Sequence, residues 1–158
     1  MSRWVVLLHV AVAFWFVAGL IGRNLTLARA RSRQQVRLVA ELVGLAGRFE
    51  RLMVIPGSFA VLLLGLLAVW AQDRPLAGPG NGWVLVSLLL YVPLFALVPL
   101  VFLPRGRVFD RALDDAVEHD AVTEPLTRAL RDPVVAAARN LELVVVAALV
   151  TLMVVKPF

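Results

Sequence analysis

The chain has 158 residues, of which 61% are hydrophobic, and its mean hydropathy is +0.86. Soluble globular chains are about 45–50% apolar, so this composition predicts an integral membrane protein with a single domain, residues 1–158. The absence of cysteine excludes disulfides, zinc–thiolate sites and iron–sulfur clusters, and the net charge of +5 comes from arginines that flank apolar runs, which argues against a nucleic-acid partner.

The first apolar run, residues 4–22, contains no charged residue and is about as long as a helix that crosses the hydrocarbon core of a bilayer. It is longer than the apolar region of a secretory signal peptide, and its basic cluster follows it, which indicates a retained helix. Its one titratable side chain is His9. An ionisable group inside a membrane helix is costly, so His9 is a candidate functional residue. The alternative is a neutral imidazole that only hydrogen-bonds to a neighbouring helix.

The basic segment after this run, residues 24–51, keeps helical periodicity and contains no proline. Both flanking membrane helices should therefore extend into it, with a turn near Ser32. The second apolar run covers residues 52–71. Its Pro56 and Gly57 predict a break near the inner end, of a kind that membrane helices tolerate when neighbours satisfy the freed carbonyls.

The third apolar run, residues 83–103, follows a segment rich in Gly and Pro, residues 72–82, which predicts a short irregular loop. Pro93 and Pro99 predict that the third membrane helix is bent. Tyr91 lies near mid-membrane, where its hydroxyl needs a partner, either a ligand or a backbone carbonyl.

A charged connector, residues 104–132, leads to the fourth run. Its alternating charges and helical spacing predict an amphipathic surface helix near residues 108–122. His119 lies there among acidic residues and is expected to be solvated.

Polar side chains gather near the start of the fourth apolar run, residues 133–155. Arg139 and Glu142 are spaced i,i+3 and share a helix face, with Asn140 beside them. Either they form an ion pair packed against other helices, or the helix projects from the membrane there and the pair is solvated. The candidate polar cluster of the chain comprises Tyr91, Arg139, Asn140, Glu142 and Lys156.

The basic residues concentrate in the first and third connectors, at Arg23, Arg29, Arg31, Arg33, Arg37, Arg48, Arg51, Arg105, Arg107, Arg111, Arg128 and Arg131. The four apolar runs predict an all-α four-helix bundle in the plasma (inner) membrane with amphipathic connectors. The positive-inside rule predicts that these connectors are cytoplasmic and that both termini lie outside the cytoplasm. Trp4, Trp70 and Trp83 would then form an aromatic belt at the outer edge. The lipid bilayer is the predicted environment, and a homo-oligomer or another membrane protein is left open as a partner.

This orientation places His9 roughly 7 Å below the outer edge, and Met153 at a similar depth. A haem in the outer half would be held by His9 alone, by His9 with Met153, or by two His9 residues across a dimer. Met153 has the alternative of a packing or lipid-facing role. His119 lies on the other side of the membrane and cannot share a metal with His9 in one protomer.

Four features in this order resemble the HemJ family of protoporphyrinogen oxidases, and the wider superfamily that includes CopD copper-resistance domains and uncharacterised four-helix membrane proteins. They are LHV at residues 8–10 with WFVAG at 15–19, RLMVIPGSFAVLLLGLL at 51–67, a loop ending in Gly-Trp, and the terminal MVVKPF. The resemblance implies a helical membrane bundle that binds b-type haem, with His9 as the essential histidine. Lys156 matches the family's KPF tail, and Glu142 loosely matches an acidic position of the last helix.

The third run departs from the HemJ pattern. Ser87 stands near the place of a basic residue, and the run has no histidine. This difference favours an uncharacterised relative over a working oxidase.

Three functions follow as expectations. The first is a haem-binding membrane protein with a redox role related to protoporphyrinogen oxidation, which would be a haem-dependent oxidoreductase if it is an enzyme. The second is a non-catalytic membrane scaffold or accessory subunit without a cofactor. The third is copper handling, ranked last because the soft ligands beyond the start, Met53 and Met153, lie at opposite depths.

Overall fold

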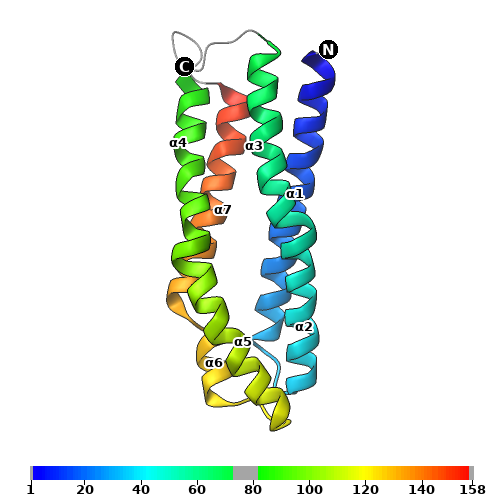
Figure 1. The fold of residues 1–158 in the computed structure, drawn as a ribbon, viewed down its shortest axis with the longest axis vertical. Coiled ribbons are helices and arrows are strands. Elements are labelled where there is room, and N and C mark those ends of the chain that lie inside the picture. Colours follow the sequence, from blue (N-terminus) through cyan, green and yellow to red (C-terminus); the bar gives the residue numbers. More distant parts are fainter. Residues whose placement is uncertain (1, 73–81, 157–158) are drawn as a thin grey trace.

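The structure, a computed structural model, describes residues 2–72 and 82–156, and every regular element in these ranges is helical. The α-helices and the two π-helical segments, η1 and η2, are α1 (Ser2–Ala30), α2 (Val36–Phe49), η1 (Glu50–Val54), α3 (Ile55–Trp70), α4 (Gly82–Leu97), η2 (Val98–Phe102), α5 (Leu103–Glu118), α6 (Glu124–Leu130) and α7 (Pro133–Val155). Figure 1 shows the long helices running along one axis, with both labelled ends of the chain at the same end of the bundle.

Within the described residues, four helical stretches are long and apolar enough to cross a membrane, Arg3–Ala30, Val36–Trp70, Gly82–Glu118 and Glu124–Val155. The predicted all-α four-helix membrane bundle is thereby confirmed. The stretches are longer than the apolar runs because α2 continues through η1 into α3, and α4 continues through η2 into α5. The turn predicted near Ser32 is confirmed, since α1 ends at Ala30 and α2 begins at Val36.

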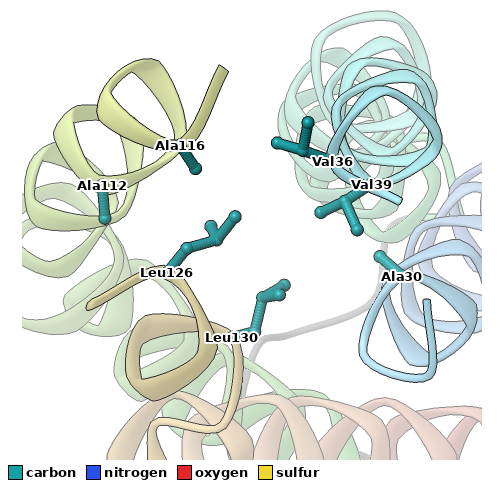
Figure 2. Packing of buried hydrophobic residues seen from close by; sticks show 7 residues of the cluster. All are labelled: Ala30, Val36, Val39, Ala112, Ala116, Leu126 and Leu130. Atoms are coloured by element: carbon teal, nitrogen blue, oxygen red, sulfur yellow. The ribbon is translucent and has the colours of Figure 1, made fainter. Parts of the chain in front are cut away.

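The end of the bundle opposite the termini is built by α2, α5, α6 and the last turns of α1, and is called the connector end below (Figure 1). It has a small apolar core of its own, in which side chains from these four helices converge (Figure 2). Its buried members are Ala30, Val36, Val39, Ala112, Ala116, Leu126 and Leu130. The two connectors therefore fold against each other, because each presents an apolar face that water would otherwise cover.

The prolines bend the apolar helices without ending them. The break predicted at Pro56 and Gly57 is wrong, because η1 runs directly into α3 with Pro56 in the first turn of that helix. Proline lacks the N–H that a continuous helix would use at this position, and the π-helical segment η1 immediately before it accommodates that loss. Pro93 lies inside α4 and Pro99 inside η2, and the bent helix that they predict continues into α5. The predicted surface helix at 108–122 is observed as Leu103–Glu118. Most of the predicted loop 72–82 lies outside the described residues.

Helix α1 packs on the stretch from α2 to α3 through glycines. A Cβ atom on Gly19 would lie 2.5 Å from Cβ of Met53, and one on Gly22 would lie 2.8 Å from the Phe49 ring. On the opposite helix, a Cβ on Gly57 would lie 3.0 Å from Cβ of Phe16. Small residues allow membrane helices to approach closely, and here they hold the first two spans together.

Candidate functional site: a buried ion cluster between two cavities

Arg23 lies on the face of α1 that points into the bundle. Six of the buried residues of this helix recur at spacings of three, four and seven: His9, Phe16, Leu20, Arg23, Leu27 and Ala30. Such spacings place side chains on one face of an α-helix. The arginine therefore belongs to a mostly apolar inner face, and it lies about 28 Å along the helix axis from Trp4.

Two carboxylates compensate the buried charge of Arg23. Its Nη1 lies 2.6 Å from Oε2 of Glu50 in η1, and its Nη2 pairs with Oε2 of Glu142 in α7. The side chains of Arg23 and Glu142 are only 6% and 12% exposed. The Phe102 ring of η2 lies 5.8 Å from the Arg23 guanidinium carbon, within the range of a cation–π contact. The cluster therefore joins one residue from each of the four spans.

The predicted group of Arg139, Asn140 and Glu142 is divided in the structure. Glu142 forms a buried ion pair, which agrees with the alternative of a packed pair. Its partner, however, is Arg23 of another helix and not Arg139. Asn140 is exposed, whereas Arg139 is partly buried and lines a cavity.

A cavity of about 760 Å³ opens beside the cluster at the connector end. Its basic lining residues are Arg23, Arg31, Arg105 and Arg139, and its acidic ones are Glu50, Asp110 and Asp132. Arg105 pairs with Asp132, as Arg23 does with Glu50. Arg31 and Arg139 form no ion pair with any residue that the structure describes, and the buried Nε of Arg31 has no hydrogen-bond partner there.

The opposite wall of this larger cavity is apolar. It is formed by the π-helical segment η2 and the start of α5, with Leu100, Phe102, Leu103, Val108 and Phe109. A space with arginines on one side and aliphatic and aromatic groups on the other suits a ligand that is itself both anionic and apolar.

A second cavity, of about 300 Å³, lies on the other side of the ion cluster. Its lining is mostly apolar and aromatic, and includes Phe16, Val54, Phe59, Leu94 and Phe95. Four residues line both cavities, Glu50, Ile55, Val98 and Phe102. The two spaces are therefore neighbours that meet at the ion cluster.

Tyr91 of α4 lines the smaller cavity and bridges two spans. Its hydroxyl donates a hydrogen bond of 2.7 Å to the carbonyl of Ser58 in α3, so its partner is a backbone carbonyl. The Ser58 hydroxyl in turn donates to the carbonyl of Ile55 at 2.8 Å. Rings of Phe59 and Phe95 lie 5.3 Å apart and continue this contact between α3 and α4.

His9 lies away from both cavities. It is buried, and its Cε1 lies 3.1 Å from the position that a Cβ on Gly65 would take, so the imidazole fits the notch left by that glycine. Its Nδ1 is buried without a hydrogen-bond partner among the described residues. No cluster of three or more His, Cys, Asp or Glu side chains that could hold a metal occurs within the described parts of the chain.

The remaining predicted site residues lie near the termini. Met153 is partly buried in the last turns of α7, on a different helix from His9. Lys156 ends α7 with a left-handed backbone, and its Nζ lies 5.6 Å from the centre of the Trp83 ring. Lys156 is thus at the opposite end of the bundle from Arg139. His119 is exposed at the end of α5, as expected.

Sequence reasoning missed Arg23, which it counted only as one of the basic residues of the connector, and Glu50, which it did not single out. One signal was available for Arg23, since it follows His9, Phe16 and Leu20 at helical spacing. No comparable signal pairs Arg23 with Glu142, because the two are separated by 119 positions.

A family model described as a predicted integral membrane protein (DUF2269) matches residues 3–157. No curated protein and no solved structure matches the chain. The match supports an integral membrane protein surrounded by lipid and gives no support to the specific resemblance to HemJ or CopD.

Proposed function

We propose that this chain, which belongs to the DUF2269 family of predicted integral membrane proteins, is a non-catalytic protein that binds an anionic amphiphile. The acidic headgroup of the ligand would lie in the larger cavity. The observation that carries this proposal is the pair Arg31 and Arg139. Both line the cavity, and neither has an ion pair within the described residues. Arginine is suited to carboxylate and phosphate groups because its planar fork donates two hydrogen bonds at once.

The depth of the cavity supports an amphiphile over a wholly polar ligand. Arg23 lies about 28 Å along α1 from Trp4, close to the thickness of the hydrocarbon core, roughly 30 Å. The larger cavity thus lies where a membrane changes from hydrocarbon to headgroups. A ligand there has its acid near the arginines and its apolar part against η2.

The π-helical segments support a binding role at this level. Insertions of this kind are rare and occur frequently at functional sites. Here η1 supplies Glu50 and η2 supplies Phe102, and both residues contact the ion cluster and line the cavity.

The experiment is retention of lipid by the purified full-length protein, read by native mass spectrometry. Phosphatidylglycerol is compared with phosphatidylcholine, and dodecyl phosphate serves as a soluble probe with the same acid-and-chain chemistry. We expect acidic lipid and dodecyl phosphate to bind, and Arg31→Gln/Arg139→Gln to lose roughly tenfold or more of that affinity, because hydrogen bonds to charged groups contribute about 1.5–3 kcal/mol each.

The matched control is Arg33→Gln/Arg128→Gln, since both of these arginines are exposed and neither lines the cavity. Its affinity should equal that of the wild type. A preference for lipid over the soluble probe identifies a membrane lipid as the source of the ligand, and the reverse identifies a soluble amphiphile. Equal retention of acidic and zwitterionic lipid would contradict the proposal.

A b-type haem with a redox role is the second candidate, and the observation that favours it is the buried Nδ1 of His9, which has no partner among the described residues. His9 would hold the iron, and Met153 is the proposed second ligand. The test is the absorption spectrum of the purified protein beside His9→Ala. A Soret band that is lost in the variant supports this candidate, and a colourless folded wild type excludes it.

We also propose that the connector end faces the cytoplasm and that the membrane is the plasma membrane. The concentration of arginine in the two connectors supports this orientation.

A further inference from the structure

We infer that the smaller cavity is the binding site for the apolar part of the ligand, and that it takes one chain. This inference rests on the proposed function. It adds that the ligand is a single-chain anionic amphiphile, such as a long-chain phosphate ester or carboxylate, which occupies both cavities and passes the ion cluster between them.

The two cavities are positioned for a single ligand. Glu50 and Phe102 line both and also belong to the contacts of Arg23, so a ligand that reaches from one cavity to the other would pass the ion cluster. Ile55 and Val98 line both as well, and they supply apolar walls along this route.

The smaller cavity is lined mostly by apolar side chains, and the polar side chains in its lining already have hydrogen-bond or ion-pair partners. The two hydroxyl groups in its lining are already engaged, that of Tyr91 with the Ser58 carbonyl and that of Ser58 with the Ile55 carbonyl. Its carboxylates, Glu50 and Glu142, are paired with Arg23. No side-chain hydrogen-bond donor among the described lining residues remains free for a sugar or a nucleotide, so a hydrocarbon chain is the chemistry that best suits the space.

The volume of about 300 Å³ selects the number of chains. This value lies at the lower limit of small-molecule pockets, about 300–1,000 Å³. The space therefore accepts one hydrocarbon chain, and a phospholipid whose headgroup occupies the larger cavity can place only one of its two chains there. Its depth agrees, because Tyr91 and Phe95 lie farther from the connector end of the α4 stretch than Phe102 does, in the direction of the hydrocarbon.

The experiment measures the affinities of butyl, octyl and dodecyl phosphate for the full-length protein held in amphipol. We expect affinity to rise by roughly fourfold for each CH₂ group that enters the cavity and then to level off, since burial of each contributes about 0.8 kcal/mol. Leu94→Trp, which fills the smaller cavity, should reduce dodecyl phosphate affinity at least tenfold and leave butyl phosphate affinity unchanged. Leu89→Trp is the matched control, because Leu89 lies on the same helix but is 62% exposed and lines neither cavity.

The outcomes separate the two proposals. Failure of every alkyl phosphate to bind overturns the proposed function. Binding with no dependence on chain length, or equal loss in Leu94→Trp and Leu89→Trp, leaves the headgroup site standing and overturns the chain site.

A second measurement on the wild type covers the case in which Leu94→Trp does not fold. Dodecyl phosphate with a photoreactive diazirine at the end of its chain should label Tyr91, Leu94 or Phe95, which line the smaller cavity and are buried or partly buried. Labelling confined to lipid-facing positions such as Leu89 overturns the inference.

Discussion

Arg23 brings a full charge into the interior of the bundle, where Glu50 and Glu142 compensate it. Replacing it by leucine leaves two carboxylates without a cation in a poorly hydrated place. Removing one partner of a buried ion pair costs about 3–5 kcal/mol, so Arg23→Leu should lower the free energy of unfolding by that amount. The measurement is unfolding of the purified protein in mixed detergent micelles with increasing SDS, followed by circular dichroism.

The control for this prediction is the exposed pair of Arg128 and Glu124, which has the same separation of 2.6 Å as Arg23 and Glu50. Exposed i,i+4 pairs contribute about 0.3–0.5 kcal/mol, so Arg128→Leu should be nearly neutral. Replacing Arg23, Glu50 and Glu142 together by leucine should recover most of the lost stability, because an apolar core can substitute for a buried ion cluster. If Arg23→Leu and Arg128→Leu unfold alike, the cluster has no structural role.

The sequence allowed part of this site to be predicted at the level of residues. Helical spacing from His9 to Arg23 was an available but unused sign that the arginine faces inward, and Glu142 was predicted to share a helix face with Arg139, either in a packed ion pair or solvated. The pairing of Arg23 with Glu142 could not be predicted from the sequence, because Arg139 lies only three positions before Glu142 and is the nearer candidate partner. Local spacing favours that pair, and only the packing of α1 near α7 selects the other.

At the scale of elements, the close approach of α1 to η1 and α3 depends on Gly19. A Cβ there would lie 2.5 Å from Cβ of Met53, a distance at which one of the two helices must shift. Gly19→Ala should therefore lower the free energy of unfolding by about 1–3 kcal/mol, the usual cost of overpacking. The same SDS titration measures it.

The control is Gly44→Ala, at a glycine of α2 that has no atom within 4 Å of its would-be Cβ. Alanine favours a helix interior over glycine by about 0.5–1 kcal/mol, so this variant should be slightly more stable than the wild type. Opposite signs for the two substitutions attribute the effect to helix packing, whereas a shared sign would contradict it.

Asp132 connects two elements, since it is the N-cap residue of α7 and forms an ion pair with Arg105 of α5. Its carboxylate accepts hydrogen bonds from the backbone N–H groups of Val134 and Val135, at 2.8 and 3.3 Å, and pairs with Arg105. Asp132→Ala removes both functions and should cost about 1 kcal/mol or slightly more. Asp132→Asn keeps a good cap and removes only the charge, so it should lie closer to the wild type in the thermal midpoint. Equal losses in the two variants would assign the effect to the ion pair instead.

The elements themselves were largely predictable, because an apolar run of about twenty residues leaves few alternatives to a membrane helix. The π-helical segments were not. Pro56 and Pro99 indicate that the helices deform, but sequence does not say whether the backbone ends, kinks or gains a residue in one turn. The structure shows the last of these. The π-helical segment η1 ends two residues before Pro56, and η2 contains Pro99.

At the scale of the whole molecule, composition and four apolar runs predict the number of spans and the placement of both termini at one end. They do not predict which spans are neighbours, since every span offers similar aliphatic surface to the others. Glycines on α1 and α3, the ion cluster and the bond from Tyr91 to Ser58 make that selection. The connector end shows the same principle, because its apolar core forms only when both connectors meet (Figure 2).

The distribution of arginines predicts that the connector end faces the cytoplasm, and a labelling experiment can test this orientation. The chain contains no cysteine, so single cysteines can be introduced without background. Two sites suit this purpose. Ser32 lies in the exposed turn after α1 at the connector end, and Gln72 lies in the exposed turn after α3 at the opposite end. A membrane-impermeant maleimide should modify Gln72→Cys in intact spheroplasts and Ser32→Cys in inside-out vesicles. The reverse pattern would place the connector arginines outside the cytoplasm, and a headgroup bound in the larger cavity would then come from the outer leaflet.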